Sequence, residues 1–154
     1  MRRRQVRMKG EALLKEYLQA KGLPHPAEPV ETGPFGDSPE MARELLALIV
    51  SGRKQATCWA CLNEEPPEPG CLTVVTDWEG EAGAVIETVR ARRMRFSDVT
   101  WELARKEGED ECFDTWRGGH IRFFTEEGRR EGYEFSEEME IIFEEFRMVW
   151  PEMK

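Results

Sequence analysis

Two residues with reactive side chains, Lys54 and Thr57, lie three positions apart where a helical pattern ends and a β-like pattern begins. A lysine removed from water can lose its proton and act as a base, or stay charged and stabilise an anion. A threonine hydroxyl becomes nucleophilic only when such a base lies beside it. In an extended strand the two side chains would face opposite sides, whereas a turn would aim both at one cavity. The spacing therefore leaves open a catalytic pair or an exposed lysine beside an ordinary strand residue.

Glu107 is the carboxylate that would complete this chemistry, and it lies near the end of a predicted helix. A carboxylate beside Lys54 would shuttle protons or hold the ammonium in place. In this hypothesis Lys54 is the base or the electrostatic stabiliser, and Thr57 is the nucleophile or the residue that aligns it. Glu107 is the proton shuttle.

Aromatic, imidazole and guanidinium side chains are the candidates for substrate binding. Trp59 would stack on a base, or it would belong to the core. His120 follows Trp116 by four residues on an aromatic helix face, so it would contact a ligand or serve as a hydrogen-bonded structural histidine. The residues that we assign to substrate binding are Arg53, Trp59, Arg90, Arg92, Trp116 and His120.

Four arginines lie close together at positions 90, 92, 93 and 95. On a strand, Arg90 and Arg92 share one face while Arg93 and Arg95 share the other. They would suit a phosphate backbone, or they would pair with the abundant acidic side chains of a mixed-charge surface.

Two groups of residues have side chains of the kinds that bind metals. Glu107 and the run Glu109–Glu111 would hold Mg²⁺ through their oxygens, or form a solvated acidic helix end. Cys58 and Cys61 form a single CxxC pair, which is weak evidence for zinc because a structural site needs four ligands. On an extended strand their thiols would also point to opposite faces. We therefore predict no metal site and no cofactor, with Mg²⁺ as the alternative.

Length and composition favour one globular domain with a core, because the chain has 154 residues, 40% of them hydrophobic and 34% charged. The net charge of −9 argues against the clamping of long duplexes, which depends on lysine and arginine. A nucleotide or a short strand would still fit a locally positive pocket. The basic segment 1–8 lacks the apolar region of a secretory signal, so we expect a cytoplasmic protein with reduced cysteines. No stretch approaches the roughly 18 apolar residues that span a membrane.

Hydrophobic periodicity and capping residues predict an α+β fold with antiparallel strands that curl into a small barrel. Ser38 followed by Pro39 is a strong helix start, and Pro24 to Pro34 mark an extended linker. The predicted helices are Lys9–Lys21, Ser38–Ser51, Ser97–Gly108 and Asp110–Thr125. The predicted strands are Lys54–Trp59, Cys71–Thr76, Gly83–Phe96 and Met139–Trp150.

Several short motifs resemble those of the ASCH domain, a family with a PUA-like fold. Gly52-x-Lys54-x-x-Thr57 resembles the family's GxKxxT motif, and Phe35–Glu40 resembles the segment that opens the first helix in a small bacterial branch. Ala104–Gly108 resembles the branch's A-x-x-E-G helix end, and Trp116–Phe124 resembles its W-x-x-x-H-x-x-F-F stretch. The resemblance covers Phe35 to Trp150. It divides the chain into an N-terminal helix with a proline-rich linker, 1–34, and an ASCH domain, 35–150.

The resemblance implies a PUA-like small mixed or antiparallel β-barrel flanked by helices, with an RNA-linked pocket beside it. Small bacterial relatives include an N(4)-acetylcytidine amidohydrolase, whose lysine, threonine and glutamate match Lys54, Thr57 and Glu107. Other relatives are RNA-binding proteins or metal-dependent ribonucleases. One departure concerns the ligand, because the motif often continues to an arginine at the position of Trp59.

Three hypotheses follow for function. The first is a hydrolase that acts on a modified nucleoside or a short RNA, with amide hydrolysis as the version that has the clearest residue roles. The second is a binding module without turnover, in which Arg90 and Arg92 lie near phosphate. The third is metal-dependent RNA cleavage by the acidic residues after Lys106. The expected partner is a nucleoside or short single-stranded RNA, with no membrane and no obligate protein partner.

Overall fold

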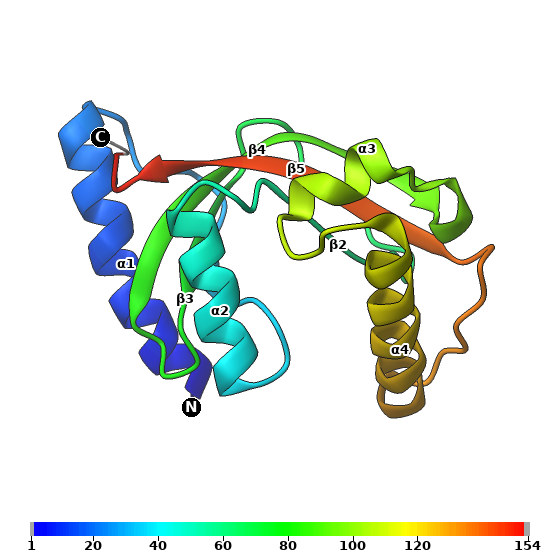
Figure 1. Cartoon of the computed structure of the whole chain (residues 1–154). Coiled ribbons are helices and arrows are strands. Elements are labelled where there is room, and N and C mark those ends of the chain that lie inside the picture. The colour runs from blue at the N-terminus through cyan, green and yellow to red at the C-terminus, as the bar shows by residue number, and fades with distance from the viewer. Residues whose placement is uncertain (1, 153–154) are drawn as a thin grey trace.

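The computed structural model describes the backbone of residues 2–152, with side chains from Gly10 onward. The described residues form four α-helices, five strands and two short 3₁₀ turns, arranged as in Figure 1. The helices are α1 (Arg2–Lys21), α2 (Pro39–Val50), α3 (Trp101–Ala104) and α4 (Phe113–Glu131), and the 3₁₀ turns are η1 (Phe96–Asp98) and η2 (Arg105–Glu107). The strands are β1 (Glu31–Pro34), β2 (Ala56–Ala60), β3 (Leu72–Thr76), β4 (Ala82–Arg95) and β5 (Glu140–Trp150).

The five strands form one mixed sheet in the order β1-β3-β4-β5-β2. The β1–β3 pair is parallel, and the other three pairs are antiparallel. The sheet curls into an open half-barrel, and α2 and α4 lie beneath its arch (Figure 1). The predicted α+β fold with a curled mixed sheet is confirmed, and β1 and β2 are the two edges of the half-barrel.

The two long strands, β4 and β5, form the backbone of the arch. Their pairing shifts register between Val85 and Ile86 and again between Thr88 and Arg90. Such irregularities bend a strand and increase its twist, which accounts for the curl. Because β5 also pairs with β2, the curl brings the start of β2 under the arch.

Local signals set the entry and exit of α2. The side chain of Ser38 accepts a hydrogen bond from the backbone N–H of Met41, as an N-cap does. The helix ends at Val50, and Gly52, two residues later, has a φ of 84° in the left-handed region that favours glycine. The N–H groups of Arg53 and Lys54 then both donate to the carbonyl of Leu48. The chain therefore turns at Lys54 before it extends into β2.

Helix α1 belongs to the core. Leu14, Tyr17 and Leu18 are buried against Val74 of β3 and Val85 of β4. The ring of Tyr17 also lies 6.2 Å, between centroids, from that of Trp150 at the end of β5. The helix predicted over Lys9–Lys21 is thus present and begins earlier, and it covers one end of the sheet (Figure 1).

Three sequence-based boundaries differ from the structure. The linker predicted as extended surface chain contains β1. This strand forms by backbone pairing with β3, and the sequence of the linker has no strand pattern that would predict it. The helix predicted from Ser97 begins instead at Trp101, because Thr100 caps it. Helix α4 runs from Phe113 to Glu131 rather than from Asp110 to Thr125. The predicted domain boundary between residues 34 and 35 falls between β1 and α2.

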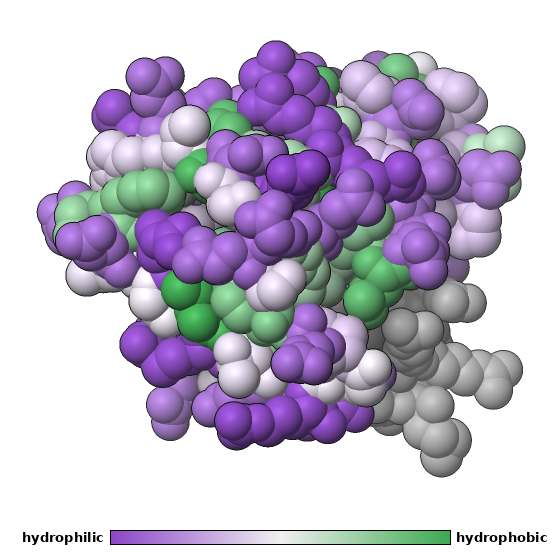
Figure 2. Space-filling model, turned by 90° about the vertical axis from the view of Figure 1, so that its right-hand side faces the viewer, coloured by the Kyte–Doolittle hydropathy of each residue, from purple (hydrophilic) through white to green (hydrophobic). Residues whose placement is uncertain are grey.

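Figure 2 shows that the face on the α4 side is mostly hydrophilic, with apolar side chains in small patches. In the described part of the chain, no helix combines the length and the hydrophobicity that crossing a membrane requires.

Candidate functional site

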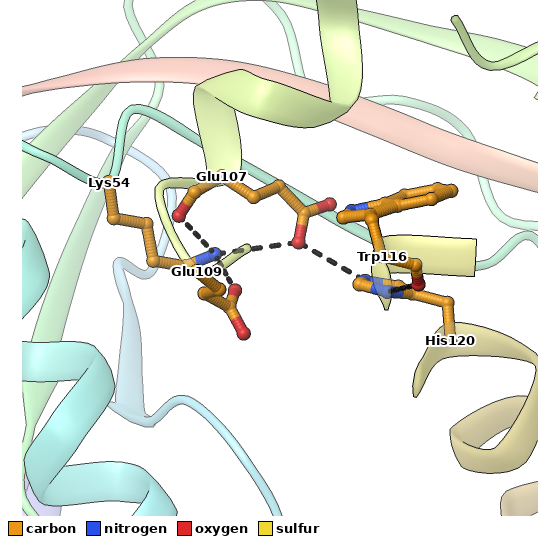
Figure 3. Close-up of polar contacts among 5 residues, drawn as sticks. All are labelled: Lys54, Glu107, Glu109, Trp116 and His120. Atoms are coloured by element: carbon orange, nitrogen blue, oxygen red, sulfur yellow. Dashed lines mark hydrogen bonds and ion pairs between the residues drawn. The ribbon is translucent and has the colours of Figure 1, made fainter. Parts of the chain in front are cut away.

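Four charged side chains form a row beneath the arch, which we call the Lys54 cluster: Lys54, Glu107, Glu109 and His120. Lys54 and Glu107 are buried, His120 is half-buried, and the side chain of Glu109 is 26% exposed. The Nζ of Lys54 donates to Glu109 Oε2 at 2.6 Å and lies 3.7 Å from Glu107 Oε1. The same Oε1 atom of Glu107 lies 3.2 Å from Nε2 of His120 (Figure 3). The side chains of Lys54 and Glu107 are only 1% and 2% exposed. Charges of alternating sign thus follow one another from Glu109 to His120.

A close backbone contact joins the segment that carries Lys54 to the segment that carries Glu107. Gly108 has a φ of 74°, and a β-carbon there would overlap the carbonyl oxygen of Arg53. The N–H of Gln55 donates to the carbonyl of Lys106 at 2.8 Å, beside this contact. Only glycine permits both the positive φ and the close approach. The glycine of the A-x-x-E-G motif therefore places Glu107 beside Lys54.

His120 is fixed by contacts on both ring nitrogens. Its Nδ1 donates to the backbone carbonyl of Trp116 at 2.9 Å, and its ring stacks on the Trp116 indole at 4.1 Å between centroids. A carbonyl can only accept, so Nδ1 carries a proton. An ionised Glu107 can likewise only accept from Nε2. The geometry therefore favours the doubly protonated imidazolium, and the pKa of His120 is raised: burial opposes this, but the bond and charge of Glu107 outweigh it.

Lys54 is held as an ammonium in this arrangement. Burial lowers its pKa, but the charges of Glu107 and Glu109 outweigh burial and raise the pKa above its ordinary value. For Glu107 the effects have the opposite sign. Burial alone would raise the pKa of this carboxyl, but the Lys54 ammonium and the His120 hydrogen bond outweigh burial and lower the pKa. Of the two roles predicted for Lys54, electrostatic stabiliser fits this state, whereas a base would need a neutral amine.

Glu109 differs from Glu107 although both carboxylates share the same ammonium. Burial and the neighbouring charge of Glu107 raise the pKa of Glu109 despite its short bond to Lys54. His120 bonds Glu107 directly, whereas only its charge acts on Glu109, so it supports the ionised form of Glu107 more strongly. Glu109 is thus the carboxyl of the Lys54 cluster that accepts a proton more readily.

Cys58 lies against Glu107 and His120. Its sulfur, a carboxylate oxygen of Glu107 and a ring nitrogen of His120 all lie within 4.8 Å of one another. Burial, followed by the charge of Glu107, raises the pKa of the Cys58 thiol well above its ordinary value. The thiol is therefore neutral and a poor nucleophile.

Two buried polar atoms have no hydrogen-bond partner among the described residues, Oε2 of Glu107 and Nε1 of Trp116. Figure 3 shows this oxygen turned toward the indole of Trp116, away from Lys54. Buried polar atoms are usually paired, so these two are exceptions that call for a reason.

A cavity of about 980 Å³ opens beside the Lys54 cluster. This volume suits a ligand of nucleoside size. Thr57 and Trp59 line it from one face of β2, and Glu144, the cross-strand partner of Thr57 in β5, lines it too. Lys54, Cys58, Glu107, Glu109 and His120 complete the polar part of the wall.

Glu144 is a buried carboxyl on this wall that pairs with no cation among the described side chains. It is 6% exposed and accepts a hydrogen bond from the hydroxyl of Thr88 at 2.6 Å. Burial raises its pKa, although the Thr88 bond opposes the rise. Sequence reasoning missed Glu144, because only the register of β5 against β2 brings it beside Thr57.

Sequence-predicted site residues fall into two groups. Lys54, Thr57, Trp59, Glu107 and His120 all line the cavity, and the turn before β2 brings the first two to the same wall. Four others are not among its lining residues: Arg53, Arg90, Arg92 and Trp116.

Two of the residues outside the cavity, Trp116 and Arg90, have partners elsewhere. Trp116 is 1% exposed and packs in the core, where it orients His120. Arg90 forms an ion pair with Glu145 at 2.8 Å, and its side chain is 57% exposed. Arg93 pairs with Glu65, and Arg95 pairs with Glu138. This is the mixed-charge pairing given above as the alternative to phosphate binding.

The residues considered for metal binding are arranged differently from either sequence pattern. Glu107 and Glu109 face the ammonium of Lys54. Cys58 faces Glu107, whereas Cys61 donates to the carbonyl of Glu64. The grouping of Cys58 with Glu107 and His120 was missed, because it joins three separate segments of the chain.

Comparisons with known proteins agree with this architecture. The family model described as the ASCH domain matches residues 31–150. A crystal structure of an ASCH domain from Lactobacillus crispatus JV V101 is similar with a TM-score of 0.81 and 26% identity, covering 92% of this chain and 94% of that chain. A protein from Enterococcus faecalis V583 is similar with a TM-score of 0.81 and 28% identity, covering 93% of this chain and 91% of that chain. No curated protein matches the sequence.

Proposed function

The chain belongs to the ASCH domain family, and we propose that it is a hydrolase that removes an acyl group from a modified nucleoside or a short RNA. N(4)-acetylcytidine is the candidate substrate. Nucleic-acid binding is general in this family, which supports a nucleoside as the ligand. The observation that carries the proposal is a buried ammonium, Lys54, fixed by two carboxylates on the wall of a cavity of about 980 Å³ that Thr57 also lines.

The residues present support a two-step amide hydrolysis. The hydroxyl of Thr57 attacks the acyl carbon, and its proton passes through Glu107 to the leaving nitrogen as the C–N bond breaks. The products of this step are the free nucleoside amine and an acyl ester on Thr57. Water then cleaves the ester, which releases the carboxylic acid and restores the hydroxyl. The ammonium of Lys54 stabilises the oxyanion of both tetrahedral intermediates.

Glu144 supports recognition of a cytosine edge in the same cavity. A carboxyl with a raised pKa keeps its proton more readily, so it presents a donor and an acceptor side by side. The cytosine edge offers the complementary pair, an acceptor ring nitrogen next to an N–H donor. Because Glu144 lies opposite Thr57 across the β2–β5 pair, a base held there would direct its exocyclic nitrogen toward Thr57.

The test is turnover of N(4)-acetylcytidine, followed by chromatography of the released cytidine. We expect the wild-type protein to release cytidine and acetate, and Lys54→Met to lose at least about 100-fold in kcat/KM, as for loss of an oxyanion-stabilising group. Thr57→Val should also lose turnover while it keeps the side-chain shape. Arg95→Met is the matched control, because it replaces an exposed cation outside the cavity. Absence of turnover in the wild type, or full turnover in Lys54→Met, would overturn the proposal.

A second candidate function, nucleoside binding without turnover, is favoured by the protonation of Lys54. An ammonium held by two carboxylates leaves Thr57 without the neutral amine that would activate it. In this version, calorimetry with cytidine and N(4)-acetylcytidine should detect binding that Glu144→Leu weakens, while no cytidine is released. Salt-dependent RNA binding that Arg90→Ala and Arg92→Ala weaken would extend the site to phosphate. A flat titration with every nucleoside and RNA would exclude the binding version.

A further inference from the structure

We propose that Cys58, Glu107 and His120 form a binding site for a thiophilic divalent cation such as Zn²⁺ on the cavity wall. Their ligand atoms, one sulfur, one oxygen and one nitrogen, all lie within 4.8 Å of one another. The three residues belong to β2, η2 and α4. In a tetrahedral zinc site, bonds of about 2.0–2.3 Å place ligand atoms roughly 3.5 Å apart. A shift of about 1 Å in these side chains would therefore bring all three onto one ion.

The orientation of His120 is that of a metal ligand. Metal-binding histidines usually donate their second ring N–H to a carbonyl or carboxylate, which fixes the tautomer and the ring plane. Here Nδ1 donates to the carbonyl of Trp116 at 2.9 Å. Stacking on Trp116 holds the ring as well. Nε2 is the atom left to face Glu107 and Cys58.

An independent observation is the unpaired oxygen of Glu107. Its Oε2 is buried and has no hydrogen-bond partner among the described residues, and the residue is only 2% exposed. A buried carboxylate oxygen without a partner is costly. Oε2 now faces the indole of Trp116, whose Nε1 is the other buried atom without a partner, so a cation shared with Cys58 and His120 would supply the missing partner once the carboxylate rotates.

The charge of the site is compatible with a divalent cation despite the nearby ammonium. Lys54 is held by Glu109 at 2.6 Å, which is closer than its 3.7 Å approach to Glu107. A bound ion displaces one proton from Nε2 of His120 and one from the thiol of Cys58. Two positive charges thus replace two protons, and the net charge of the buried site does not change.

The ligand set selects the class of metal. Thiolate, imidazole and carboxylate together are typical of zinc, whereas Mg²⁺ prefers oxygen ligands alone. Three protein ligands leave a fourth position, which opens to the cavity because all three residues line it. The inference does not rest on the proposed hydrolysis, and its readout is independent of activity.

The test uses Co²⁺ as a spectroscopic probe for the reduced full-length protein. We expect one equivalent of Co²⁺ to produce a thiolate charge-transfer band in the near ultraviolet and visible bands of a tetrahedral ion, and Zn²⁺ to remove both. Cys58→Ser should lose the charge-transfer band. His120→Ala should weaken Co²⁺ binding at least about 10-fold, since even a residue that only supports a ligand contributes that much.

Cys71→Ser is the matched control, because Cys71 is an exposed thiol away from the cavity, and it should keep the full spectrum. Thermal unfolding without metal shows whether each variant is folded. Zn²⁺ should raise the melting temperature of the wild type and of Cys71→Ser, but not that of Cys58→Ser or His120→Ala. The inference fails if the wild type gives no charge-transfer band. It also fails if the band survives in Cys58→Ser or disappears in Cys71→Ser.

Discussion

The Lys54 cluster and the arginine segment of β4, Arg90–Arg95, both place cations beside carboxylates, and they differ in burial. The side chain of Lys54 is 1% exposed and meets two carboxylates. Arg90 and Arg95 are 57% and 61% exposed. Water screens the charges of the arginine segment. In the Lys54 cluster, where water is largely excluded, the charges shift one another's pKa values. The difference teaches that a run of cations in a sequence identifies a site less well than one cation that the fold removes from water.

The largest expected effect is that of removing the central carboxylate of the Lys54 cluster. Glu107→Ala should reduce the free energy of unfolding by about 3–5 kcal/mol, because it leaves the buried charge of Lys54 with one partner fewer and removes the partner of His120 Nε2. Glu138→Ala, which removes the exposed partner of Arg95, should change it by less than about 0.5 kcal/mol. Urea denaturation measures both. Equal losses in the two variants would break the contrast between the buried and exposed charges.

The next effect tests how the Lys54 cluster is held together without any change of charge. Gly108→Ala should reduce the free energy of unfolding by about 1–3 kcal/mol, because alanine strains the positive φ and meets the Arg53 carbonyl. Gly132 also has a positive φ, 91°, but has open space around it. Gly132→Ala should therefore show the smaller loss that comes from backbone strain alone. Denaturation curves of the two variants separate strain from overlap, and identical losses would mean that the Arg53 contact contributes nothing.

A smaller effect concerns the dependence of stability on pH. The folded pKa of His120 lies above its unfolded value of 6.5, so its contribution is fully present below pH 6.5 and is lost as the pH rises through the folded pKa. His120→Gln should remove this loss and flatten the stability curve on the alkaline side of pH 6.5. Glu107 faces the ring directly and Glu109 lies beyond it, and both remain in the variant. Urea denaturation at several pH values from 6 upward tests this; a variant curve parallel to that of the wild type would contradict the assignment.

The smallest effect is expected on the arginine segment. Arg90→Ala should reduce the free energy of unfolding by about 0.2–1 kcal/mol at low salt, and by less at 1 M NaCl, where screening acts over about 3 Å. The loss in Lys54→Met should depend much less on salt, because the side chain of Lys54 is only 1% exposed, although that of its partner Glu109 is 26% exposed. Paired denaturation curves at the two salt concentrations provide the measurement. A salt-sensitive Lys54→Met would place its ammonium nearer to water than the structure does.

Local signals in the sequence predict much of the fold. Ser38 and Pro39 start α2 as expected, and the long β-like run from Gly83 becomes β4. Four-residue β1 was not predicted, because Glu31–Pro34 has no strand pattern and forms only through pairing with β3. Thr100 rather than Ser97 caps α3 because η1 intervenes, and no propensity argument distinguishes those two caps.

Only the site residues that belong to short sequence motifs could be predicted. Lys54, Thr57 and Glu107 came from short motifs, and all three line the cavity. The partners of these residues depend on contacts between distant segments, such as that of Gly108 with Arg53. Glu109 was assigned to a possible Mg²⁺ cluster, although its carboxylate faces Lys54. Glu144 and Cys58 required the β2–β5 register and the packing of α4, which a single sequence does not give.

Helix α1 has a consequence for where this protein can be cut. The family match begins at residue 31, after the helix, yet Leu14, Tyr17 and Leu18 are buried against Val74 and Val85. A chain trimmed to residues 31–150 would expose this apolar surface of β3 and β4 to water. The independently folding unit is therefore larger than the segment by which its relatives are recognised, and a fusion partner or an affinity tag belongs before α1 rather than in place of it.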